Sequence, residues 1–255
     1  MLMVVERATQ KPLTEPHLVR VAGWTLERYL QEAPEDAFWE FVRGEVVMHS
    51  PVRIEHQDLT RFLTFLLHGF CLHYRCGRVY NGPAAVRVLP EVVREPDIFV
   101  LSLDDALQAR GVLVEARPLL IVEVVSPSTR TLDLVEKAYD YAQAGVPEYW
   151  VVDREEQTFH QHVLEQGRYA VAVYRQGRVS SHVLPGFWLD VAWLWQEPLP
   201  SEWDVLERVL GREPPADRRL LTADCRPPTA NRPFQEEVSH EIPDHWRARS
   251  PGRFH

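Results

Sequence analysis

Hydrophobic and polar positions follow two different periods along this chain of 255 residues. Over residues 54–74, apolar side chains recur at spacings of three and four, which predicts a long helix with one buried face. The same spacing over residues 132–144 predicts a second helix, and Gly145 behind it is a typical helix end. Shorter helices are expected over residues 25–32 and 201–210.

Runs of β-prone residues predict the strands of a sheet. They lie at residues 39–48, where two strands form a hairpin, and at 85–89, 98–101, 119–125 and 148–153. The run 119–125 is apolar except for one Glu, which is typical of a central strand covered on both faces. Together with the helix that follows, it predicts a right-handed crossover to the strand at 148–153. Three further runs, at 159–164, 169–174 and 179–184, predict a β-meander that extends or flanks the sheet.

The two ends of the chain lack a sustained apolar period. We therefore expect an N-terminal arm over residues 1–20, one globular domain over residues 21–195, and a largely flexible tail over residues 196–255. The tail is rich in proline and arginine and contains little apolar periodicity beyond the short helix at its start.

Composition narrows the classes of function. The net charge of −9 argues against broad attraction to nucleic acid, so such a substrate would need a local arginine patch. Three cysteines without a secretory leader predict no disulfide framework and a reducing cytoplasm. No apolar run is long enough for a membrane span, so we expect no membrane partner.

Lysine is rare in this chain: Lys11 and Lys137 are the only lysines among 28 basic residues. An ammonium is a compact point charge with rotatable donors, whereas guanidinium is a planar fork. Lys137 is the one lysine inside the predicted domain, and it follows two acidic residues in apolar surroundings, Asp97 and Glu123. This order of residues suits a metal-dependent nuclease site.

The two acidic residues are candidate metal ligands. Asp97 follows Pro96 at the start of a predicted strand, and Glu123 lies inside the apolar run LLIVEVV. A buried carboxylate must be paired, protonated or bound to a cation. With the Val124 carbonyl and waters, two carboxylates can complete the oxygen shell of Mg²⁺ or Mn²⁺. Lys137 would orient water and offset negative charge.

Plainer interpretations stay open for each of these residues. Lys137 would form an exposed ion pair with Asp133 at helical spacing, Glu123 would pair with Arg87, and Asp97 would cap a turn. Glu40 is either a metal ligand from the hairpin or a solvated strand residue, and His56 and Gln57 either approach the cleft or lie on a surface helix. The set His68, Cys71, His73 and Cys76 does not have the spacing of a zinc site.

Three segments carry a resemblance to a known family. They are WEFVRGEVVMHSPVRIEHQ, EPDIFV and LLIVEVVSPSTRTLDLVEKAYDYAQAGVPEYWVVD. Together, over about residues 22–195, they resemble the Uma-type endonuclease family of the PD-(D/E)XK restriction-endonuclease-like superfamily. The resemblance implies an α/β fold: a restriction-endonuclease-like core with a mixed central β-sheet flanked by helices, followed by the β-meander.

The resemblance also implies roles for particular residues. The family's metal carboxylates fall on Asp97 and Glu123, and its early acidic residue falls on Glu40. The superfamily lysine usually stands two residues after the Glu, where this chain has Val125, so the resemblance implies that it has moved to the helix as Lys137.

The expected function is therefore a Mg²⁺- or Mn²⁺-dependent endonuclease acting on DNA. Arg94 and Arg130 are candidate phosphate contacts because they are near the site in sequence. The alternative is a non-catalytic descendant of the nuclease fold that binds nucleic acid or a protein. A homodimer is an option, although nothing in the chain marks an interface.

Overall fold

The computed structural model describes residues 17–34 and 37–212. Within these ranges there are two six-stranded sheets and one two-stranded sheet. The predicted arm up to residue 16 and the predicted tail from residue 213 lie outside the described residues. Among the described helices, none is both long and apolar enough to cross a membrane.

The central sheet contains the predicted crossover. Its strands, in order across the sheet, are β12 (Arg168–Tyr174), β11 (Thr158–Glu165), β10 (Glu148–Asp153), β9 (Leu120–Val124), β7 (Ile98–Leu101) and β4 (Arg78–Asn81). Only β9 and β10 pair in parallel within this sheet, and the helical segments η1 (Leu132–Lys137) and α4 (Ala138–Gln143) connect them. The hairpins from β10 to β12 extend the sheet, as predicted for the first two runs of the meander. The third run contributes Arg178–Ser180 to the separate two-stranded sheet instead.

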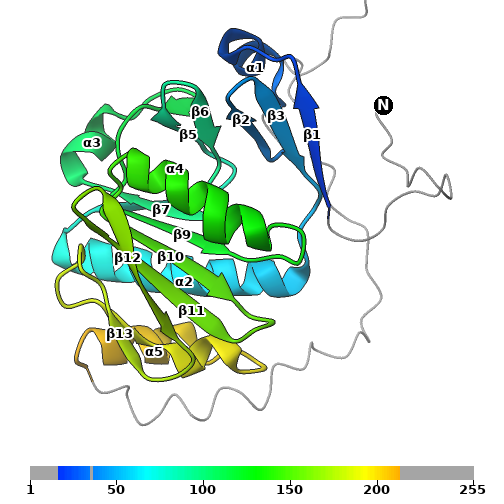
Figure 1. The fold of residues 1–255 in the computed structure, drawn as a ribbon. Helices are drawn as coiled ribbons and strands as arrows, with labels where there is room; N and C mark the ends of the chain where they lie inside the picture. The colour runs from blue at the N-terminus through cyan, green and yellow to red at the C-terminus, as the bar shows by residue number, and fades with distance from the viewer. Residues whose placement is uncertain (1–16, 35–36, 213–255) are drawn as a thin grey trace, which may run out of the picture. The chain divides into compact units, whose positions relative to one another are not determined.

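Helices cover both faces of β9, as its apolar sequence predicts. On one face, α2 (Ile54–Tyr74) packs Leu59, Phe62 and Leu66 into a core that includes Val122 and Val124. On the other face, Tyr141 of α4 packs with Ile121 and Tyr149. In Figure 1, α4 lies in front of the central sheet and α2 lies behind it. Glu123 alternates with Val122 and Val124, so its side chain points to the α4 face.

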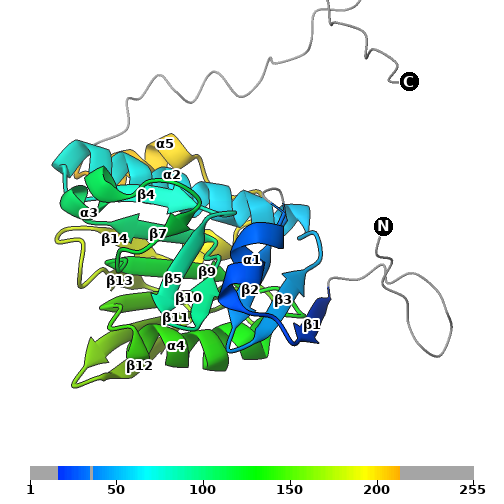
Figure 2. The same ribbon diagram turned by 90° about the horizontal axis from the view of Figure 1, so that it is seen from above.

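A second sheet, which we call the outer sheet, was not predicted as a separate element. Its strands, in order, are β1 (Leu18–Ala22), β3 (Glu45–His49), β2 (Trp39–Val42), β6 (Val92–Arg94), β5 (Ala85–Leu89) and β8 (Leu113–Val114). The predicted hairpin is β2 and β3, and its turn places Arg43 and Gly44 at φ values of 48° and 86°. Figure 2 shows β1, β2 and β3 beside α1 (Leu26–Glu32).

Residues 178–210 pack on the α2 side of the core. This segment contains β13 (Arg178–Ser180), β14 (Trp188–Asp190), η2 (Val191–Trp195) and α5 (Glu202–Val209). Elsewhere in the chain, the short helix α3 (Leu103–Gln108) follows β7. Val205, Leu206 and Val209 of α5 join the core on the α2 face, so the packed chain continues past the predicted boundary at residue 195. A Cβ at Gly69 of α2 would lie only 2.5 Å from Leu206 Cδ2, so a larger residue there would require the Leu206 side chain to shift.

Candidate active site

The central sheet places Asp97 and Glu123 opposite each other. The register of β7 and β9 pairs Ile98 with Val122, and one residue further it brings Asp97 opposite Glu123. Residues directly opposite in an antiparallel pair share a face of the sheet. The Val124 N–H donates to Asp97 Oδ2 over 2.7 Å, which fixes this carboxylate at the end of β9.

Lys137 reaches the same place from the helix that covers the sheet. Its Nζ lies 2.9 Å from Glu123 Oε1, 3.3 Å from Glu40 Oε1 and 3.3 Å from Asp133 Oδ1. All four side chains are at most 3% exposed. Lys137 ends the π-helical segment η1, and such segments occur frequently at functional sites. The predicted residues Glu40, Glu123 and Lys137 therefore meet, and the pair with Asp133 is buried rather than exposed.

Arg94 does not contact solvent, which corrects the expectation that it binds phosphate. Its side chain is fully buried and donates from Nη1 to Glu40 Oε2 over 2.8 Å and from Nη2 to Asp140 Oδ2 over 2.6 Å. Arg94 is thus a structural partner that holds Glu40 next to Lys137. The other arginine candidate, Arg130, is one-third exposed and pairs with Asp153 and two neighbouring glutamates.

The site contains more buried carboxylates than cations to balance them. Burial, followed by the charges of Asp97, Asp133 and Glu40, raises the pKa of Glu123 well above its usual value, although Lys137 opposes this. Burial alone would lower the pKa of Lys137, but Glu123, Glu40 and Asp133 outweigh it and hold the group as an ammonium. Burial also opposes ionisation of Glu40, yet Lys137 and Arg94 keep its pKa well below the usual value.

Sequence reasoning missed Tyr141 and Glu95 in this cluster, and it placed Asp133 beside Lys137 only as an exposed ion pair. Tyr141 donates its hydroxyl to Glu123 Oε1 over 2.9 Å. Tyr141 lies four residues after Lys137, so the helical period could have placed it on the same face. Glu95 lines the site as well, and burial together with the charge of Glu40 raises its pKa to about 8.

His56 and Gln57, which the sequence left undecided, both line the site. The Nε2 atom of His56 lies 3.2 Å from Asp97 Oδ2. Burial would lower the pKa of His56, but the carboxylate of Asp97 outweighs burial and raises it. His56 thus pairs with Asp97 at the start of α2.

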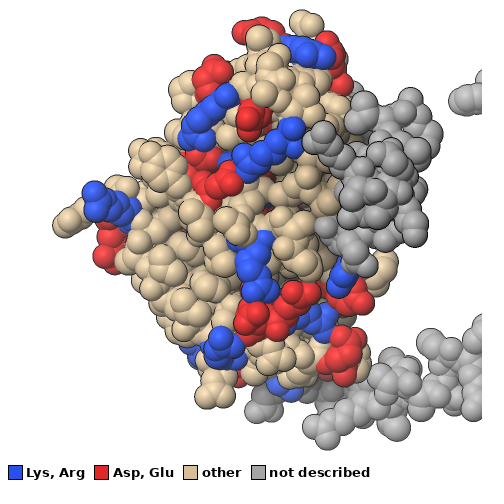
Figure 3. Space-filling view, turned by 45° about the vertical axis from the view of Figure 1, so that its right-hand side comes forward, with Lys and Arg blue, Asp and Glu red and all other residues tan. Residues whose placement is uncertain are grey.

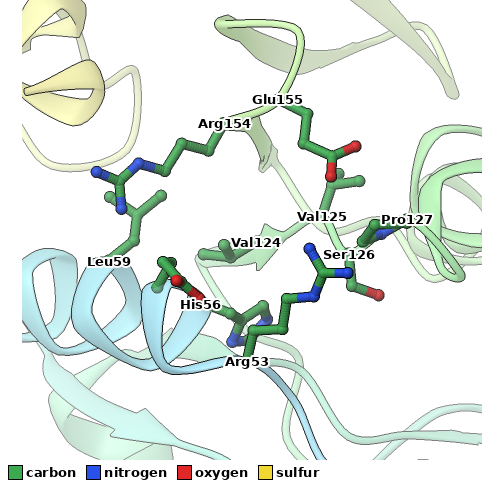
Figure 4. A pocket seen from close by; sticks show the side chains of 10 residues that line it. Arg53, His56, Leu59, Val124, Val125, Ser126, Pro127, Arg154 and Glu155 are labelled. Carbon is green, nitrogen blue, oxygen red and sulfur yellow. The ribbon is translucent and has the colours of Figure 1, made fainter. Parts of the chain in front are cut away.

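Two hollows meet at this cluster. The first has a volume of about 40 Å³ and is lined by Asp97, Glu123 and Lys137, among others. The second, shown in Figure 4, has a volume of about 280 Å³ and shares His56, Val124 and Ser126 with the first. The acidic cluster therefore opens beside a larger space at the end of β9.

The donor atoms suit a hard cation. Val124 directs its N–H toward the β7 side, so its carbonyl points the same way. The register of β7 and β9 ends at Ile98 and Val122; continued by two residues, it would bring Pro96 opposite Val124, and proline has no N–H to offer that carbonyl. Two carboxylates and one main-chain carbonyl are oxygen ligands of the kind that Mg²⁺ and Mn²⁺ prefer. In the part of the chain that the structure describes, no three His, Cys, Asp or Glu side chains form a metal-binding group by themselves.

The mixed central sheet, the crossover and the covering helices define a restriction-endonuclease-like α/β fold. A solved structure with this fold is described as "Crystal structure of a putative nuclease belonging to DUF820 from Anabaena variabilis ATCC 29413". It is 15% identical with a TM-score of 0.60, and the match covers 68% of this chain and 97% of that chain. The Uma2 family model, described as "Putative restriction endonuclease", matches residues 26–192, and the chain belongs to this family. A comparison with curated proteins gives no match.

Proposed function

We propose that this protein is a Mg²⁺- or Mn²⁺-dependent endonuclease of the PD-(D/E)XK type that hydrolyses phosphodiester bonds in DNA. Asp97, Glu123 and the Val124 carbonyl would hold the metal ion. The observation that carries the proposal is the buried contact of Lys137 Nζ with Glu123 Oε1 at 2.9 Å, on the face of the sheet that also carries Asp97. Membership of the "Putative restriction endonuclease" family supports the same chemistry.

Each residue has a distinct part in this mechanism. A bound divalent ion lowers the pKa of water and offsets charge on the phosphodiester. Because Lys137 stays an ammonium, it acts as a proton donor in hydrogen bonds that orient the attacking water and stabilise negative charge, and not as a base. Glu40 is the auxiliary acid: its contacts with Lys137 and Arg94 position the ammonium.

Contacts with DNA must be local, because the protein as a whole is acidic. Figure 3 shows basic and acidic side chains interspersed on one face, without a broad basic surface. Exposed arginines at the rim of the site therefore provide the contacts with phosphates, and Arg130 is one candidate. A homodimer and a cytoplasmic location stay predictions from the sequence.

Calorimetric titration with Mn²⁺ and Mg²⁺ tests the metal site. We expect the wild-type protein to bind metal and Glu123→Gln to lose at least about tenfold in affinity, because one charged ligand is gone. Glu32→Gln is a matched control, since Glu32 belongs to an exposed ion pair with Arg28. A plasmid-nicking assay with Mn²⁺ then compares the wild type with Lys137→Ala, and circular dichroism verifies that both are folded.

One observation favours the non-catalytic alternative. Glu123 Oε1 is already engaged by Lys137 and by the Tyr141 hydroxyl, so the cluster partly neutralises itself without a metal. A non-catalytic binding protein would keep this network for stability alone. If the wild-type protein binds neither Mg²⁺ nor Mn²⁺ in the presence of DNA, this alternative replaces the endonuclease.

A further inference from the structure

The larger of the two hollows at the site has no role in the proposed hydrolysis. The hollow around Asp97 and Glu123 holds about 40 Å³, little more than one water molecule of ~30 Å³. The neighbouring hollow of about 280 Å³ begins at the shared residues His56, Val124 and Ser126. A substrate with its phosphate at the acidic cluster would therefore extend into this second space.

The second hollow combines an apolar floor with charged groups at its rim. Leu59, Val124 and Pro127 contribute apolar surface. Arg53, just before α2, and Arg154, just after β10, enter from different sides, and Figure 4 shows Val124 between them. An apolar floor suits the face of a nucleobase, and guanidinium groups bind phosphate and stack on planar rings.

We propose that this hollow holds one unpaired nucleotide next to the bond that is cut, with its base on the apolar floor and its phosphate between Arg53 and Arg154. The inference rests on the proposed function and narrows its substrate to DNA with a single-stranded nucleotide at the cleavage point, such as a flap, an end or a loop. A base inside a continuous duplex is stacked on both faces and cannot enter a pocket unless it is flipped out.

The remaining charged groups fit a single nucleotide. Glu55 and Glu155 line the same hollow, and their carboxylates disfavour a second phosphate. Arg154 Nη2 donates to Glu197 Oε2 over 2.5 Å, but the Glu197 side chain is 78% exposed. An ion pair with so exposed a carboxylate is weak in water, so a phosphate can take the place of Glu197. Glu197 therefore competes with the substrate.

Fluorescence anisotropy with the full chain tests the pocket, with Ca²⁺ in place of Mg²⁺ to separate binding from cleavage. The probes are a labelled oligothymidylate, its duplex with oligoadenylate, and a single strand of abasic deoxyribose phosphate. We expect the oligothymidylate to bind about tenfold more tightly than either other probe, because only it offers an accessible base. Arg154→Ala should weaken oligothymidylate binding about tenfold and duplex binding much less.

Two further variants separate the pocket from general charge effects. Glu197→Gln should tighten oligothymidylate binding, because it removes the competing carboxylate, whereas a purely structural role of Arg154 predicts no gain. Arg168→Ala removes an exposed arginine on β12, outside this hollow, and should change nothing. Unchanged melting temperatures verify that the variants fold.

The outcomes distinguish this inference from the proposed function. Equal affinity for single strand and duplex, or full affinity for the abasic strand, overturns the pocket even if the protein nicks plasmid DNA. A clear preference for the oligothymidylate that depends on Arg154 supports the pocket even if no cleavage is found. In that second case the proposed endonuclease activity is refuted, and the protein is a single-strand-binding protein.

Discussion

Replacing Lys137 with methionine tests whether the buried cluster is held together by one ammonium. Methionine keeps most of the length and apolar volume of the side chain but removes its charge. Glu123, Glu40 and Asp133 then lose a cation that lies within 3.3 Å of each, and the side chains of these three acids and of Lys137 are at most 3% exposed. Removing one partner of a buried ion pair typically costs about 3–5 kcal/mol.

The free energy of unfolding that Lys137→Met loses should increase with pH. Burial and mutual repulsion already raise the pKa of Glu123 and of Asp133, and removing the ammonium raises both further. A carboxyl group whose folded pKa is raised disfavours the folded state increasingly as pH rises from the unfolded value. The loss should therefore be about 3–5 kcal/mol near pH 8 and about 1–2 kcal/mol near pH 5. The wild-type ammonium stays charged over this interval, because its own pKa is raised.

Urea unfolding followed by tryptophan fluorescence measures both values, since Trp150 is buried in the core. Glu32→Gln is the control because Arg28 and Glu32 form an ion pair at the same helical spacing as Lys137 and Asp133, but in solvent. Glu32→Gln should lower the free energy of unfolding by less than about 0.5 kcal/mol. A loss for Lys137→Met below about 1 kcal/mol near pH 8, or an equal loss at both pH values, would refute the reasoning.

Two further predictions concern stability. Because burial and Glu40 raise the pKa of Glu95 to about 8, Glu95→Gln should stabilise the protein by about 1–3 kcal/mol near pH 9 and change little near pH 5, as measured by urea unfolding. A pH-independent effect would contradict this assignment. Leu206→Ala should cost about 2–4 kcal/mol in the same assay, because Leu206 packs in the core beneath α2. A neutral result would mean that α5 is not part of the cooperative fold.

The elements that sequence predicted correctly are those whose signals are local. The helix over 54–74, the hairpin at Arg43 and Gly44, and the central strand around Glu123 each carry their own period or turn residues. The meeting of Glu123 with Lys137 followed from a short crossover, in which few arrangements are open to the chain. The meeting of Glu123 and Lys137 could therefore be predicted from the sequence alone.

The parts that sequence missed depend on pairing between distant segments. Arg94 contacts Glu40 and Asp140, which lie 54 and 46 residues away, and only the outer sheet and the crossover bring them together. Proximity in sequence to Asp97 made Arg94 look like a phosphate contact, although its burial excludes that role. The packing of α5 on α2 was hidden for the same reason, because its partner Gly69 is more than a hundred residues away.

The proposed displacement of the lysine to the helix would explain why the site contains extra acids. In a strand, residues i and i+2 share a face, so a lysine two residues after Glu123 would project beside that carboxylate. Here Val125 takes that position and packs against the core on the α4 face, while Lys137 reaches the same face from the helix above it. In a strand, the backbone hydrogen bonds of the sheet would hold a lysine in place beside Glu123. A long side chain that extends from a helix instead needs partners along its path, and Glu40 and Asp133 supply them at 3.3 Å.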